Sequence, residues 1–143
     1  MRPVLLIFLL SLAASAAEIQ APERVVAGSE VSLQTSGSGS ATFYLIGPGQ
    51  ASQREVRAGE AIKLEGGETR HAGHYLALLR QGDSTSSAVF WVTAAKAGNV
   101  AFLARPSRVP ATRPDVVSGV AFVFDQFGNL VLSPTNVKFE LTV

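Results

Sequence analysis

Two histidines near the middle of the chain are the residues best suited to bind a metal. His71 and His74 stand three positions apart, and imidazole nitrogens are common metal ligands. A site would need further ligands, and the nearest acidic residues in the sequence are Glu65 and Glu68. Histidines at this spacing lie together on a helix but not at the entry to a strand. The residues that follow His74 indicate a strand. We therefore expect no metal ion and no other cofactor.

The residues that could catalyse a reaction are few and poorly grouped. Asp83, Asp115 and Asp125 each adjoin turn-forming residues, which favours an interpretation as solvated turn positions. The segment 36–40 contains Gly-Ser-Gly, but a nucleophile elbow must lead into a helix, and Ala41 opens a run typical of a strand. The chain has no cysteine, which excludes a thiol nucleophile, thiolate metal sites and disulfides. We expect no catalytic residue and no enzyme.

The overall charge argues against nucleic acid as a partner. The 143 residues include 12 Lys and Arg against 11 Asp and Glu, for a net charge of +1. Proteins that bind nucleic acid normally carry a basic stripe or patch. The length is sufficient for one good core, or for one core and part of another.

The first 17 residues have the three-part pattern of a secretory signal peptide. Arg2 precedes the apolar run 4–10, and small residues follow up to Glu18. The small-residue rule places cleavage after residue 16 or 17. The run is too short to span a bilayer comfortably, so we expect no membrane span after its removal, and an uncleaved anchor is the alternative. The signal predicts export to the periplasm, the cell surface or the extracellular space.

The remaining sequence favours strands and turns over helices. No apolar pattern of helical period persists, and short runs rich in Val, Phe, Leu and Thr alternate with Gly, Pro and Ser. Residues 81–83 are typical of a hairpin turn. Seven short strands with regular turns predict an antiparallel β-sandwich over residues 18–94. The expected strands are 24–26, 30–35, 41–46, 54–57, 61–64, 75–80 and 87–93.

One short motif in this region resembles a feature of immunoglobulin-like domains. The segment 71–77, His-Ala-Gly-His-Tyr-Leu-Ala, is similar to the corner that leads into strand F, where a Tyr hydroxyl bonds to upstream backbone. Tyr75 matches that tyrosine, and Ala77 occupies the position of the second cysteine. Leu33 is expected to replace its partner on strand B. The resemblance implies a cysteine-free immunoglobulin-like sandwich.

A linker at 95–99 and a second, incomplete unit at 100–143 are expected to follow. Expected strands are 100–104, 116–124 and a half-buried strand at 137–143, with a turn at 125–129. The region 106–143 resembles the opening half of a bacterial immunoglobulin-like domain of the invasin and intimin type. The matching residues are Pro106, Val109, Pro110, Ala111, Asp125, Gly128, Asn129, Val137 and Phe139.

Taken together, these features predict an all-β chain, with an immunoglobulin-like β-sandwich followed by an incomplete second immunoglobulin-like unit. The resemblance implies a spacer or adhesive module of a cell-surface or periplasmic protein, without catalytic residues. The alternatives are a carbohydrate- or protein-binding module, and an accessory domain of a longer secreted hydrolase.

The candidate binding surface is apolar. If Tyr75, Ala77 and Leu79 face the core, their neighbours in the strand must face outward, and the same alternation applies to two adjacent strands. A contiguous exposed apolar patch often marks a contact site. The expected partner is a protein or a neighbouring domain, with carbohydrate as the alternative because Trp and Tyr stack on sugars. Coverage by the second unit of this chain is a further alternative. The six outward residues are Tyr44, Ile46, Leu76, Leu78, Val89 and Trp91.

Overall fold

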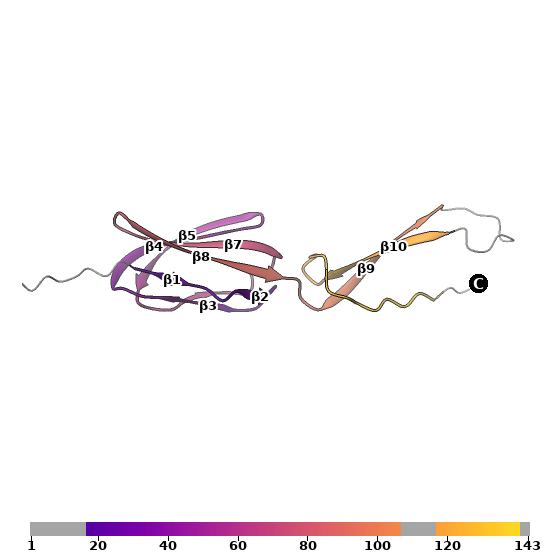
Figure 1. Cartoon of the computed structure of the whole chain (residues 1–143), viewed down its shortest axis with the longest axis horizontal. Helices are drawn as coiled ribbons and strands as arrows, with labels where there is room; N and C mark the ends of the chain where they lie inside the picture. Colours follow the sequence, from indigo (N-terminus) through magenta and orange to yellow (C-terminus); the bar gives the residue numbers. More distant parts are fainter. Residues whose placement is uncertain (1–16, 107–116, 141–143) are drawn as a thin grey trace, which may run out of the picture.

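The computed structural model describes residues 17–106 and 117–140, and this part of the chain contains strands but no helix. It therefore holds no helix that is long and apolar enough to cross a membrane. Figure 1 shows a β-sandwich at one end and a two-stranded hairpin that continues past the end of the sandwich. The predicted all-β sandwich is confirmed. The expected signal peptide lies outside the described residues, except for Ala17.

The larger sheet of the sandwich has five strands in the order β2-β8-β7-β4-β5. The predicted antiparallel pairing holds for the neighbours among β8, β7, β4 and β5, but not for β2, which pairs in parallel with β8. Strands β7 and β8 form a hairpin whose turn contains Gly82 at a positive φ of 56°, as the 81–83 pattern predicts. The strands are β2 (Arg24–Val26), β4 (Gly39–Gly47), β5 (Gln50–Ala58), β7 (Gly73–Gln81) and β8 (Ser84–Thr93).

The smaller sheet has three strands in the order β1-β3-β6. They are β1 (Ile19–Gln20), β3 (Val31–Thr35) and β6 (Ile62–Leu64). All seven expected strands of the sandwich are present. The two-residue strand β1 was not predicted, because two residues carry no readable alternation.

The core of the sandwich lies between the two sheets, and its aromatic centre is Tyr75. The Tyr75 ring stacks on Phe90, with ring centroids 5.3 Å apart, and both residues are fully buried. The hydroxyl of Tyr75 donates a hydrogen bond of 3.0 Å to the carbonyl oxygen of His71. Burial raises the pKa of Tyr75, although this hydrogen bond and the charge of Arg70 oppose the rise. The predicted hydrogen bond from the Tyr75 hydroxyl to upstream backbone is therefore present, and Leu33 and Ala77 are both fully buried.

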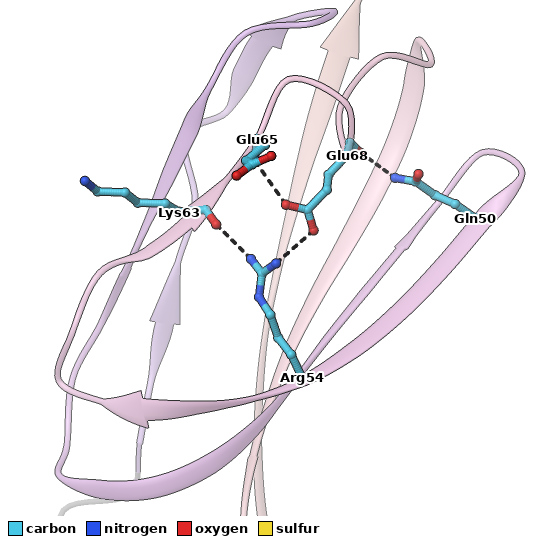
Figure 2. Close-up of polar contacts among 5 residues, drawn as sticks. All are labelled: Gln50, Arg54, Lys63, Glu65 and Glu68. Atoms are coloured by element: carbon cyan, nitrogen blue, oxygen red, sulfur yellow. Dashed lines mark hydrogen bonds and ion pairs between the residues drawn. The ribbon is translucent and has the colours of Figure 1, made fainter.

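One open side of the sandwich is closed by a polar network around Arg54 of β5 (Figure 2). Its guanidinium contacts the carboxylate of Glu68 at 3.0 Å and donates to the carbonyl oxygen of Lys63 at 2.8 Å. The other carboxylate oxygen of Glu68 accepts from the backbone N–H of Glu65, and its carbonyl oxygen accepts from Gln50. Arg54 also lies over the ring of Phe43. The network thus links an edge of the larger sheet to the loop that follows β6.

Ala17 belongs to the core rather than to the segment before it. Its side chain is buried, and a Cβ added to Gly37 would lie 3.0 Å from its Cα. Of the two expected cleavage positions, the one after residue 16 retains this packing and the one after residue 17 removes it.

The second unit is a hairpin of β9 (Ala97–Arg105) and β10 (Ser118–Asp125). Both expected strands are present. The expected linker of 95–99 is too long, because β9 already begins at Ala97, so the connection from β8 is Ala94–Lys96.

The expected half-buried strand at 137–143 is wrong for its described part. Residues 137–140 are extended but unpaired, and Lys138, Phe139 and Glu140 are exposed. Phe139 instead rests against Phe102 of β9, with ring centroids 4.8 Å apart. Alternation of apolar and polar residues indicates a segment with one buried and one exposed side. A strand also requires a neighbouring strand with free backbone groups. This segment lies over the hairpin rather than at its edge, so it has no such neighbour among the described residues.

Candidate interaction surface and the joint between the units

The six residues predicted to face outward lie together on one face of the larger sheet. Their strand neighbours Phe43, Tyr75 and Phe90 are fully or almost fully buried, which establishes the expected alternation. The six side chains come from the adjacent strands β4, β7 and β8 (Figure 1). We call them the outer apolar face: Tyr44, Ile46, Leu76, Leu78, Val89 and Trp91.

Cross-strand pairing makes the outer apolar face continuous. Leu78 stands opposite Tyr44, and Leu76 stands between Ile46 on one side and Val89 on the other. Val89 is 60% exposed and Ile46 44%, whereas Tyr44, Leu76 and Leu78 are half-buried. Side chains in cross-strand pairs cover each other from solvent only in part, so this surface remains accessible to a partner.

Trp91 forms the end of the outer apolar face that is nearest to the second unit. It stands opposite His74, and the two rings meet edge to face with centroids 3.4 Å apart. Trp91 is 47% exposed. It also lines a groove of about 640 Å³ that runs between the end of β8 and the segment after β10, where Leu130 and Leu132 form the opposite wall. The second unit therefore borders this surface at Trp91.

The joint between the two units is built around Asp125, the last residue of β10. Asp125 is fully buried, which corrects its interpretation as a solvated turn residue. Its carboxylate accepts hydrogen bonds of 2.8–2.9 Å from the backbone N–H groups of Ala95, Phe127 and Asn129, and a fourth from the Asn129 side chain. Desolvation raises the pKa of this carboxyl, but the four hydrogen bonds outweigh it and hold the pKa below its ordinary value.

Asn129 fastens the joint to the sandwich. Its side-chain oxygen accepts from the backbone N–H of Ala72 at 2.8 Å, and its amide nitrogen donates to the carbonyl oxygen of Arg70 at 2.8 Å. Beside it, the Phe127 ring packs so closely over Gly28 that a Cβ there would overlap the ring. Gly28 has a positive φ of 78°, so glycine is favoured at this position on two counts.

The sequence placed Asp125 and Asn129 in a turn but gave no sign that this turn docks on the sandwich. The partners of Asn129, which are Arg70 and Ala72, lie more than fifty positions away and contribute only backbone groups. The distant partner of Asp125 is likewise a backbone group, the N–H of Ala95. Because almost every residue type has the same backbone N–H and carbonyl groups, such contacts cannot be predicted from the residue types. The only available signal is the pairing of Asp125 with Asn129 around Gly128, which also fits an ordinary turn.

The two histidines have structural contacts. Nε2 of His71 lies 3.1 Å from the Nε of Arg70, and the His74 ring contacts Trp91. Glu68 is engaged by Arg54, as Figure 2 shows. Among residues 17–106 and 117–140, no three His, Asp or Glu side chains converge as they would around a metal ion. Asp83 lies exposed in the β7–β8 turn, and Asp115 lies outside the described residues.

Neither the family models nor the curated proteins to which the sequence was compared contain a match.

Proposed function

We propose that this protein is an exported, non-enzymatic module of immunoglobulin-like type that serves as a spacer and interaction part of a cell-surface or periplasmic protein. The observation that carries the proposal is the joint. A spacer must hold its units at a fixed distance. The hydrogen bonds of the buried Asp125 and of the half-buried Asn129 connect the two units through side chains as well as through the chain itself.

The short connection between the units supports a stiff arrangement. Only Ala94–Lys96 separate β8 from β9, and the N–H of Ala95 is itself bonded to Asp125. Flexible linkers are typically rich in Gly and Ser, whereas this connection is Ala-Ala-Lys. Relative motion of neighbouring domains is the default unless their interface is large and hydrophobic, so stiffness here must come from the short connection and from the hydrogen bonds of the joint.

The immunoglobulin-like assignment is supported by two features of the sandwich. The first is the corner in which Tyr75 bonds to His71. The second is the adjacency of β4, β7 and β8 in one sheet, which corresponds to the grouping of strands C, F and G in such domains. Export is supported by the signal-like pattern of the first 17 residues.

The stiffness of the joint is tested by a distance measurement between the units. The chain has no cysteine, so Ser52→Cys on β5 and Ser118→Cys on β10 allow two spin labels to be attached specifically. We expect pulsed electron paramagnetic resonance to give one narrow distance distribution, and Asn129→Ala to broaden it. Dilution with unlabelled chain keeps the distances within one molecule. A broad distribution in the otherwise unchanged protein would contradict the spacer proposal.

A second function, partner binding, is favoured by the open state of the outer apolar face. The second unit meets the sandwich at its end and leaves Ile46 and Val89 exposed. We propose that a protein or a neighbouring domain docks here, with carbohydrate as the alternative at Trp91 and His74, because an exposed aromatic edge beside a groove is suited to stacking on sugars.

Two substitutions test this surface. We expect Trp91→Ser and Leu76→Ser to change the free energy of unfolding by about 1 kcal/mol or less, because neither side chain is part of the core. A loss of several kcal/mol would contradict an exposed surface. Trp91 is the only tryptophan, so a shift of its fluorescence on titration with soluble cello- or chito-oligosaccharides reports sugar binding directly. An unchanged spectrum would contradict binding of these sugars at Trp91.

A further inference from the structure

The edges of the sandwich are protected against pairing with another chain. Strand β5 carries Arg54, Glu55 and Arg57 along one edge of the larger sheet, and β2 at the other edge is only three residues long. The edge strands of the smaller sheet have two and three residues. Charged and short edge strands are the usual means by which proteins avoid association through sheet edges.

Strand β9 lacks this protection. It runs for nine residues, of which only Arg105 is charged, and β10 is its one neighbour in the described part of the chain. No backbone hydrogen bond joins its other edge to a described residue. The edge of β10 is different, because the N–H of Val131 bonds to the carbonyl oxygen of Val123 and Leu130 bridges Phe124.

The hairpin also has more apolar surface than two strands can bury. Leu103, Val120 and Phe122 are exposed on one face, and Val100 and Phe102 are exposed on the other. An isolated two-stranded hairpin is at best marginally stable in water, and independent stability needs three or more strands with a hydrophobic face. A further strand at the free edge of β9 would extend both apolar faces at once.

We propose that the free edge of β9 pairs with β9 of a second copy of this chain, in antiparallel fashion and with Ala101 opposite its own counterpart. The sequence of β9 is compatible with itself in this register. Val100 stands opposite Phe102, a pairing of β-branched and aromatic side chains that stabilises sheets. Arg105 stands opposite Ala97, so no like charges meet. The product is a symmetric four-stranded sheet in the order β10-β9-β9-β10, and such two-fold interfaces are the commonest among homo-oligomers.

Crosslinking through a single introduced cysteine tests the register. Opposed residues of antiparallel strands have Cα atoms about 4.5–5.5 Å apart, which suits a disulfide. We expect Ala101→Cys to form a disulfide-linked dimer on mild oxidation. In the matched control Asn99→Cys, which lies on the same face, the two cysteines are four positions out of register and about 13 Å apart, so no crosslink is expected. A dimer that crosslinks equally at both positions would overturn the proposed register.

Charge substitutions test the interface without oxidation. Ala101→Lys places two lysines opposite each other. We therefore expect the dissociation constant of the dimer, measured by sedimentation equilibrium, to rise about fivefold. Ala101→Glu is expected to do the same, and a mixture of the two variants should restore a heterodimer. A protein that is monomeric at millimolar concentration, or a dimer indifferent to both charges, would overturn the proposal and leave the edge to another partner.

Discussion

Replacing Tyr75 with alanine is expected to lower the free energy of unfolding of the sandwich by about 3–5 kcal/mol, a large part of the stability of a domain of this size. The ring is fully buried between the sheets, stacks on Phe90 and packs tightly against Gly47. Its removal leaves a cavity and also frees the carbonyl oxygen of His71 from its hydrogen bond. Urea denaturation followed by the fluorescence of Trp91 measures the loss.

Two further variants separate the ring from the hydroxyl. Tyr75→Phe keeps the ring and removes only the hydrogen bond to His71, so we expect a smaller loss of about 1–3 kcal/mol. Tyr44→Ala removes the other tyrosine of the chain, which lies on the outer apolar face, and should cost much less than Tyr75→Ala. Equal losses for the two alanine variants would contradict the assignment of Tyr75 to the core and of Tyr44 to the surface.

The sandwich could be predicted from sequence because its strands carry their own signals. Alternation along 41–46, 75–80 and 87–93 identifies both the buried side and the outer apolar face, since successive side chains of a strand point to opposite faces. The corner at Tyr75 then fixes which of the two sides is buried. The outward positions of Leu76 and Trp91 follow directly from that one assignment.

The second unit was less predictable because its contacts depend on residues distant in the chain. The alternation from Val137 onward has the pattern of a strand, yet the described residues of this segment lie unpaired against the hairpin. Asp125 shows the opposite error, because a polar residue in a turn is normally solvated. Its burial is favourable only because four donors bond to the carboxylate, and one of them is the N–H of Ala95, thirty positions earlier in the chain. Neither outcome is encoded in the residue type alone.

Removing the carboxylate of Asp125 is expected to release the joint while leaving the sandwich folded. Asp125→Ala leaves the buried N–H groups of Ala95, Phe127 and Asn129 without an acceptor, and each unpaired group costs about 1–3 kcal/mol. Amide hydrogen exchange should show lost protection at these three positions and unchanged protection in β7 and β8. The distance distribution between labels on β5 and β10 should broaden at the same time.

Acid should have the same effect on the unmodified protein. The pKa of Asp125 is lowered on folding, so its contribution is fully present above the unfolded value of 3.8 and is lost as the pH falls through the lower folded value. We therefore expect the joint to remain closed at neutral pH and to open at a pH below about 3.8, with the distance distribution broadening over that range.

Asp125→Asn has no carboxyl to titrate, and its joint should be open at all pH values because its amide nitrogen faces groups that are themselves donors. A joint that stays closed in both Asp125→Ala and Asp125→Asn would show that the carboxylate does not hold the units together. The fixed spacing would then rest on Asn129 and on the packing of Phe127 over Gly28.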